Sequence, residues 1–383
     1  MKIYFEMLLK YAISFFVVML LLGGCTGGGA YSLRSDKGKK QNLKILLAKN
    51  MESVEFSING PFKIDSTAVF SVGPKSFRAK IKNNSIVIED KVYGSRVNIA
   101  SDNHRFHLSK SEFRGDLLLY VESGKLNAVE NFTMEEYLYG VVGREMSGSS
   151  PIEALKAQAV AARTFGYYEK SIRKTNEYDI DNLIQSQAYI GTESENQYSI
   201  EAVDLTCGEV MKYKGDVIFA AFAANCGGYT ENNKEVFGYS LPYLQAVPCT
   251  FCRKYEHASW QEEIETTYIV SSLKKKGLDV TIISGIDIID TSKAGRVKTI
   301  SIATDKGRIN MSINEFRLAV GSEKFKSARF SVRTKGNTLL FKGRGWGHGV
   351  GMCQDGADGM AKLGNNYRRI LTRYYCGIEI GQK

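Results

Sequence analysis

Residues 150–170 read SPIEALKAQAVAARTFGYYEK and carry the clearest secondary-structure signal in the chain. Ser150 is a candidate N-cap, and a proline directly after it, followed by Glu153, is typical of the first turn of a helix. Apolar side chains then recur at spacings of three and four residues. These positions are Ile152, Leu155, Ala159, Ala162 and Phe165. The pattern predicts a helix from Pro151 to about Lys170, and its many alanines allow close packing against neighbouring elements.

A shorter helix is predicted just upstream, over residues 134–146, where apolar side chains again follow a helical period. Thr133 and Glu136 have the spacing of a capping box at its start. Residues 43–120 instead alternate apolar and polar side chains between turn sequences, which is typical of short strands. Strands and helices are mixed in the rest of the chain. The sequence therefore predicts an α+β fold, with a small β-rich region preceding a larger domain over residues 121–383.

The N-terminus has the composition of an export signal. Residues 1–24 combine two lysines with an apolar run shorter than the about 20 residues that a membrane-spanning helix needs. The run ends in Leu-Gly-Gly-Cys at Cys25, which resembles the lipobox of bacterial lipoproteins, where the cysteine is lipidated. Residues 25–42 contain three consecutive glycines and several lysines, and we predict a flexible tether there. A plain signal peptide and an uncleaved anchor are the alternatives.

The charge balance limits the partners of the chain. It contains 51 lysines and arginines against 41 aspartates and glutamates, a formal net charge of +10. This excess favours a polyanionic partner. Because the predicted location is outside the cytoplasm, anionic wall polymers or a membrane surface fit the charge better than nucleic acid does. We therefore expect an exported lipoprotein, anchored in the membrane at the cell envelope, that does not bind nucleic acid.

Two long motifs resemble the signatures of the SpoIID/LytB family of bacterial cell-wall proteins. The first spans residues 129–165 and contains EYLYGVV, then the pair Glu145-Met146, then EALKAQAVAART. The second reads GRGWGHGVGMCQ from Gly343 to Gln354. Shorter similar runs lie between them. The resemblance covers roughly residues 117–380 and implies that residues 121–383 form a SpoIID-like catalytic domain.

The resemblance implies a peptidoglycan lytic transglycosylase, which cleaves between N-acetylmuramic acid and N-acetylglucosamine and leaves a 1,6-anhydro end. The catalytic acid of this family is the glutamate of the Glu-Met pair, here Glu145. Glycosidic cleavage needs a proton on the leaving oxygen. The sugar's own 6-hydroxyl replaces the second carboxylate that hydrolases need, so no cofactor is required for catalysis. The competing interpretation is that Glu145 is a solvated residue at a helix end.

Other positions in the two motifs are candidates for contacting the glycan. Arg163 occupies the family's arginine position, where its guanidinium can hold the lactyl carboxylate or pair with Glu145. An exposed helix arginine is the alternative. Gln158 is a candidate partner for an acetamido group, or a packed polar residue. Alternate glycines in the second motif leave one face bare for backbone or sugar. Trp346 and His348 lie on the other face, either as glycan contacts or as core residues.

Six cysteines remain after Cys25. An even number in an exported protein permits three disulfides. However, the sequence CTFC has the spacing of half a zinc site, and two further cysteines can complete four thiolates, with His257 as the competing fourth ligand. These four candidates are Cys226, Cys249, Cys252 and Cys353. We expect a structural zinc ion at this site, with disulfides as the alternative.

The sequence thus favours an exported enzyme that cuts peptidoglycan glycan strands. The alternative is a non-catalytic peptidoglycan-binding protein that stimulates or positions a cell-wall amidase. The presence of both Glu145 and Arg163 favours the enzyme. A zinc amidase is disfavoured, because the chain has only four histidines and they are scattered.

Overall fold

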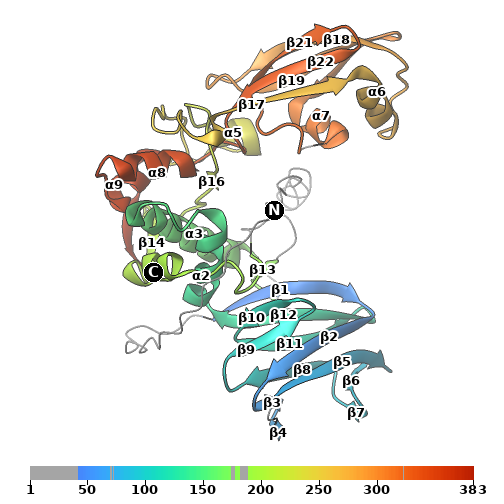
Figure 1. Ribbon diagram of the computed structural model, residues 1–383, viewed down its shortest axis with the longest axis vertical. Coiled ribbons are helices and arrows are strands. Elements are labelled where there is room, and N and C mark those ends of the chain that lie inside the picture. The colour runs from blue at the N-terminus through green and yellow to red at the C-terminus, as the bar shows by residue number, and fades with distance from the viewer. Residues whose placement is uncertain (1–41, 70, 72, 174–176, 182–188, 322) are drawn as a thin grey trace.

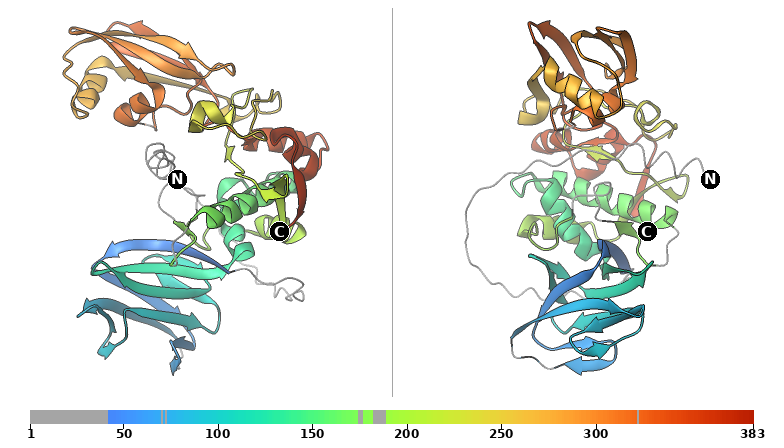
Figure 2. Two further views of the ribbon diagram at one scale, coloured as in Figure 1. Left: turned by 180° about the vertical axis from the view of Figure 1, so that it is seen from behind. Right: turned by 90° about the vertical axis from the view of Figure 1, so that its right-hand side faces the viewer.

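The computed structural model describes residues 42–383 except 70, 72, 174–176, 182–188 and 322. The predicted signal peptide, Cys25 and nearly all of the predicted tether lie outside these residues. In the described part of the chain, no helix is both long and apolar enough to cross a membrane. Three parts follow one another along the long axis: a β-lobe, a central helical part and an upper lobe (Figures 1 and 2).

The β-lobe is built from twelve N-terminal strands. These are β1 (Asn42–Met51), β2 (Ser53–Asn59), β3 (Phe62–Ile64), β4 (Thr67–Val69), β5 (Pro74–Lys82), β6 (Ser85–Ile88), β7 (Lys91–Val92), β8 (Arg96–Ser101), β9 (Arg105–Leu108), β10 (Ser111–Arg114), β11 (Asp116–Glu122) and β12 (Lys125–Thr133). They form a sheet of order β1-β12-β11-β8-β3-β4, extended at β1 by β13 (Ile180–Asp181), and a second sheet of order β10-β9-β2-β5-β6-β7. Alternate residues of β2 are buried, and both sheets contribute to one core.

The central part contains the two helices predicted from the sequence. Helix α2 (Met134–Glu145) follows β12 directly and begins with the predicted capping box of Thr133 and Glu136. Helix α3 (Ile152–Ile172) confirms the longer prediction. The N-cap of α3 is Pro151, without a side-chain cap, so the capping role expected of Ser150 is wrong. The carboxylate of Glu153 instead accepts a hydrogen bond of 2.8 Å from the backbone N–H of Tyr367.

Helix α3 is the centre of this part. Its alanines leave little side-chain bulk, so α2 and several later helices pack closely around it. The other elements here are α4 (Gln197–Leu205), β14 (Glu209–Tyr213), β15 (Asp216–Val217), β16 (Phe222–Ala223), α5 (Asn233–Phe237), the 3-10 helix η1 (Glu256–Ala258), β23 (Met352–Cys353), α8 (Gln354–Lys362), α9 (Tyr367–Tyr374) and β24 (Glu379–Gln382). Strand β23 pairs in parallel with β16. The C-terminal segment therefore returns to the middle of the molecule, beside α3 (Figure 1).

The upper lobe lies between β16 and β23 in the sequence and has a core of its own. It contains β17 (Ser259–Glu265), α6 (Thr266–Lys274), β18 (Ile283–Thr291), β19 (Val297–Thr304), β20 (Gly307–Ser312), α7 (Ile313–Val320), β21 (Phe330–Lys335) and β22 (Thr338–Arg344). The strands form two three-stranded sheets, β17-β22-β21 and β18-β19-β20. The predicted α+β class is confirmed. The sequence predicted residues 121–383 as one domain, without a separate upper lobe.

Candidate active site

Glu145 is the last residue of α2, and its side chain is partly exposed. The chain leaves the helix at Met146 in an extended conformation, so no further helical turn covers the carboxyl group. The side-chain amide of Gln354, the first residue of α8, donates a hydrogen bond of 3.0 Å to Glu145 Oε2. The same amide nitrogen lies 3.3 Å from Oε1 of Gln158 on α3. One neutral side chain therefore connects three helices behind the candidate acid.

Two polar groups lie beneath this contact. Among the described residues, neither the Tyr137 hydroxyl nor Gln158 Nε2 has a hydrogen-bond partner, although both atoms are buried. Burial raises the pKa of Tyr137 well above its usual value, and the negative charge of Glu145 adds to this. The Tyr137 hydroxyl therefore keeps its proton and remains a hydrogen-bond donor. Buried donors of this kind ordinarily have an acceptor, so these two atoms are exceptions among the described residues.

Gln158 does not reach the surface. It is 0% exposed, whereas Gln354 above it is 7% exposed. A direct contact with the acetamido group of a sugar is therefore wrong for Gln158, and its other predicted role, a packed polar residue, is correct. Sequence reasoning missed the importance of Gln354, although this residue ends the second family motif. The signal was present in the motif, but nothing local connected Gln354 to Glu145.

Arg163 lies in a different place from the one predicted. Its side chain is 0% exposed and forms an ion pair with Glu135, with 2.5 Å between Nη2 and Oε2. Its remaining donors reach the backbone carbonyls of Val203, at 3.2 Å, and Glu209, at 3.2 Å. A fully buried guanidinium with its donors used in this way has none left for a substrate carboxylate. The predicted catalytic role of Arg163, and the predicted pairing with Glu145, are therefore wrong.

The glycine-rich loop of the second motif packs against protein backbone rather than leaving a face for sugar. A Cβ atom on Gly345 would lie 2.6 Å from the carbonyl oxygen of Asn225, and one on Gly351 would lie 1.9 Å from that of Ala221. Both glycines also have positive φ, at 81° and 72°. The alternating glycines thus allow the loop to lie directly on the segment around β16.

Trp346 and His348 have different surroundings within this loop. The Trp346 side chain is partly exposed. Its ring is nearly perpendicular to the ring of His257, with 4.9 Å between the two centroids, and Lys326 Nζ lies 4.6 Å from the Trp346 ring centroid. Its indole thus retains surface for a ligand. The imidazole of His348 accepts a hydrogen bond of 3.0 Å from Val350 N–H through Nδ1. Burial, with the nearby charge of Arg296, lowers the pKa of His348 to about 4. This histidine is therefore neutral and structural.

The four candidate cysteines come together. Their sulfur atoms all lie within 4.8 Å of one another, and all four side chains are buried. His257 is not among them, because its Nδ1 lies 3.2 Å from Oδ2 of Asp355 instead. The fourth side chain of this cluster is therefore that of Cys353. Cys353 is followed directly by Gln354, so this cluster and the partner of Glu145 are neighbours in the chain.

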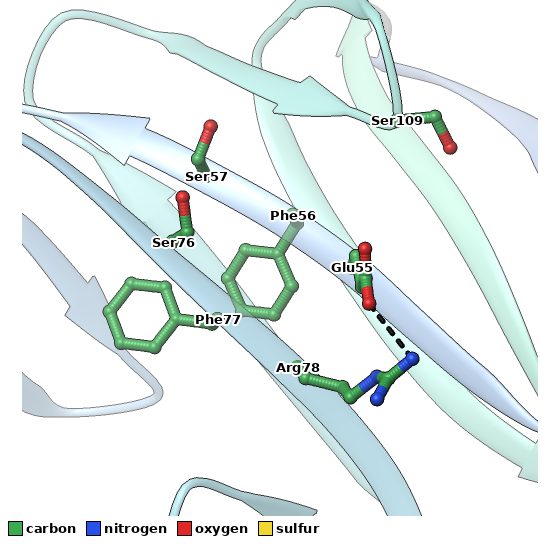
Figure 3. Close-up of a pocket in the computed structure, with 7 residues that line it drawn as sticks. All are labelled: Glu55, Phe56, Ser57, Ser76, Phe77, Arg78 and Ser109. Atoms are coloured by element: carbon green, nitrogen blue, oxygen red, sulfur yellow. Dashed lines mark ion pairs between the residues drawn. The ribbon is translucent and has the colours of Figure 1, made fainter.

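A recess of about 430 Å³ lies far from these residues in the sequence, on β2 and β5 of the β-lobe (Figure 3). Figure 3 shows the rings of Phe56 and Phe77 side by side in it, next to an ion pair of 2.9 Å between Glu55 and Arg78. Both charged side chains are more than half exposed. The recess contains no part of the Glu145 site.

Known proteins resemble this chain over the region just described. A family model described as Stage II sporulation protein (SpoIID) matches residues 122–213, which include α2, α3 and Glu145. Stage II sporulation protein D of Bacillus subtilis is 31% identical over 271 residues, covering 67% of this chain and 76% of that protein. The chain belongs to the SpoIID/LytB family. This membership places its function in the bacterial cell wall.

Two further relatives are similar to this chain over more of its length. The amidase enhancer of Bacillus subtilis is 31% identical over 360 residues, covering 80% of this chain but only 50% of that protein. An uncharacterized protein of Brachyspira hyodysenteriae is 32% identical over 349 residues, covering 88% of this chain and 92% of that protein. A second family model, a domain of unknown function (DUF8618), matches residues 252–351. This match corresponds closely to the upper lobe.

Proposed function

We propose that this protein is a peptidoglycan lytic transglycosylase in which Glu145 acts first as general acid and then as general base. The observation that carries the proposal is the position of Glu145: a partly exposed carboxyl group at the open end of α2, held from behind by a neutral amide. Family membership supports the assignment, since Glu145 is the glutamate of the family's Glu-Met pair.

The proposed reaction needs one carboxyl group. Glu145 donates its proton to the glycosidic oxygen as the bond from that oxygen to C1 of N-acetylmuramic acid breaks. The 6-hydroxyl of the same sugar then bonds to C1 and gives its proton to the Glu145 carboxylate. The products are a free N-acetylglucosamine hydroxyl and a 1,6-anhydro ring, and no water is consumed. The carboxyl group ends the cycle protonated, as it began.

Gln354 is proposed to orient this group. Its amide donates a hydrogen bond to Oε2 of Glu145, which restricts the direction of the carboxyl group. Gln158 in turn holds the Gln354 amide, because it accepts the second hydrogen of the same nitrogen. Both residues are positioning residues, since they lie behind the carboxyl group. The exposed part of Trp346 is the proposed surface for stacking on a sugar ring.

Product analysis tests the proposal. The full chain is incubated with purified glycan strands that carry or lack stem peptides, and the products are examined by mass spectrometry for 1,6-anhydro ends. We expect such ends with the wild-type chain, none with Glu145→Gln, and wild-type amounts with Glu201→Gln, which changes an exposed glutamate on α4. Binding of strands by both wild type and Glu145→Gln, without any change in strand length, would overturn the enzymatic proposal.

The second candidate function is stimulation of a cell-wall amidase without cleavage of the glycan. The observation that favours it is the 31% identity to a protein named amidase enhancer. A purified amidase assayed on cell walls distinguishes the two. Stimulation by wild type and Glu145→Gln alike, with no anhydro ends from either, would favour the enhancer. Stimulation that disappears with Glu145→Gln would show that glycan cleavage opens the wall to the amidase.

We also propose that the protein is exported and held at the membrane by a lipid on Cys25. The support is the short apolar run that ends in Leu-Gly-Gly-Cys. Cell fractionation tests it: wild type should be found with the membrane, and Cys25→Ala should not acquire the lipid, as judged by intact mass. An unmodified wild-type mass would contradict the lipoprotein assignment.

A further inference from the structure

Four cysteines from three distant segments form one closed cluster near the start of α8. Cys226 follows β16, Cys249 and Cys252 lie in the loop between α5 and η1, and Cys353 ends β23. Their side chains are at most 1% exposed. All four sulfur atoms lie within 4.8 Å of one another, and those of Cys226 and Cys252 are 3.7 Å apart. The cluster lies outside the SpoIID match, which ends at residue 213.

The spacing of the sulfur atoms suits a tetrahedral ion better than disulfides. In a zinc site with bonds of about 2.3 Å, neighbouring sulfur atoms are about 3.8 Å apart. A disulfide brings two sulfur atoms to about 2 Å and leaves the other pair independent of them. Here every sulfur atom is near all three others, and the described cysteines are free thiols. Four thiolates fill a tetrahedral shell, so no position remains for a water molecule or a substrate.

Hydrogen-bond donors of the surrounding backbone point at the cluster. Cys353 Sγ accepts hydrogen bonds of 3.3 Å from the N–H groups of Cys226 and Gly356. Cys353 is also the N-cap of α8, and the bond from Gly356 is its capping hydrogen bond. The Tyr374 hydroxyl lies 3.2 Å from Cys249 Sγ. N–H donors that point at sulfur are the usual outer partners of thiolates bound to a metal.

A buried positive charge lies beside the cluster. Four thiolates and one divalent ion have a net charge of −2, which is costly to bury without compensation. The guanidinium of Arg296, 3% exposed, extends from the upper lobe and donates a hydrogen bond of 3.0 Å to the carbonyl oxygen of Cys226. It also reaches the carbonyl oxygen of Gly347 in the glycine-rich loop. Arg296 thus places a positive charge next to a site that would carry a negative one.

We propose that Cys226, Cys249, Cys252 and Cys353 bind one zinc ion in a closed structural site that joins the start of α8 to the loops before the upper lobe. Zinc and iron both accept four thiolates in a tetrahedral arrangement, and the proposal commits to zinc. Zinc binding does not depend on whether Glu145 catalyses a reaction. The ion would also fix Cys353, the residue directly before Gln354. Its effect on catalysis, through the contact of Gln354 with Glu145, rests on the proposed function.

Metal analysis and thiol protection of the full chain test the proposal. The chain is purified without added metal or chelator, and zinc and iron are measured by mass spectrometry of the elements. We expect one zinc per chain. Cys249→Ser and Cys353→Ser should each lose at least about nine-tenths of it, whereas Cys207→Ser and Cys376→Ser, which change cysteines outside the cluster, should retain it. One iron per chain in place of zinc would overturn the proposal.

Thiol protection needs no variant, so it remains decisive if the cysteine variants fail to fold. In the native chain, an alkylating reagent should modify the exposed Cys207 and leave the four cluster cysteines unmodified. Addition of a strong chelator should make all four reactive and lower the melting temperature by roughly 10 °C or more. As a control, the protein is denatured with chelator but without reductant. If the four cluster cysteines still do not react with the alkylating reagent, they form disulfides, and the zinc proposal is wrong.

Discussion

The two ends of α2 carry glutamates with opposite surroundings. Glu135, in the first turn, forms an ion pair with the fully buried guanidinium of Arg163. Glu145, ten residues later at the last position of the helix, has a neutral amide from Gln354 on one oxygen and is partly exposed. The two residues have the same side chain on the same helix. Under the proposed function, the first carboxyl group is structural and the second is the one that meets the substrate.

The positions of the two glutamates determine where positive charge lies relative to the proposed reaction. A guanidinium beside a carboxyl group stabilises its ionised form and disfavours proton donation. By pairing Arg163 with Glu135 at the far end of α2, the fold keeps this cation away from Glu145. The neutral contact with Gln354 fixes the direction of Glu145 without adding a full positive charge.

The largest effect is expected from exchanging each glutamate for glutamine. Glu145→Gln should lower the rate of anhydro-end formation by about 10³-fold, since it removes the proton donor, and leave the melting temperature unchanged within about 2 °C. Glu135→Gln should do the reverse: the folded fraction should retain turnover, and stability should fall because the charge of Arg163 loses its partner. Rates and melting curves measured on both variants check this. Equal loss of turnover in both would break the contrast.

Arg163→Met should destabilise the protein by about 3–5 kcal/mol, because it leaves Glu135 without its charge partner. Chemical denaturation measures this change. Arg333→Met, which removes an exposed arginine from β21, is the matched control and should change stability by less than about 0.5 kcal/mol. If Arg163→Met instead lost turnover without any change in stability, Arg163 would have a direct contact with the substrate.

The loop that leads to Gln354 should make the protein sensitive to acid. The pKa of His348 is about 4 in the folded protein and near its usual value of about 6.5 in the unfolded chain. The unfolded chain therefore binds more protons between these values, so stability should fall as the pH drops from about 6.5 toward 4. We expect a loss of about 2 kcal/mol, since His348 retains some exposed surface. His348→Asn should reduce this loss, as followed by denaturation at several pH values; an identical pH dependence in the variant would contradict the prediction.

The smallest effect is expected at the positioning residue. Gln354→Ala removes the hydrogen bond to Glu145 but not the acid itself, so kcat should fall about 10-fold while KM stays within about twofold. Steady-state kinetics on glycan strands measure both constants. Gln261→Ala, at an exposed glutamine of β17, is the control and should match wild type. A rise in KM with unchanged kcat would mean that Gln354 contacts the substrate rather than orienting Glu145.

The sequence alone was sufficient where the signal is local or contained in a long motif. The helical period predicted α2 and α3 to within about two residues, and the capping box of Thr133 and Glu136 predicted the start of α2, because hydrogen bonds within a helix join residues only a few positions apart. The family motif identified Glu145 as the candidate acid. Cysteine spacing and count pointed to Cys226, Cys249, Cys252 and Cys353 before any distance between them was known, because few residue types bind a metal through sulfur.

Only the tertiary structure decided which residues meet. Gln354 is 209 residues from Glu145, and Arg163 is 28 residues from Glu135; no local pattern reports either contact. The choice of Cys353 over His257 depended in the same way on the return of β23 to β16 after the upper lobe. Side-chain type and local period are properties of neighbours in the chain, whereas partners depend on how distant segments pack. For this protein, the sequence named the chemical groups, and the packing of α2, α3 and α8 assigned their partners.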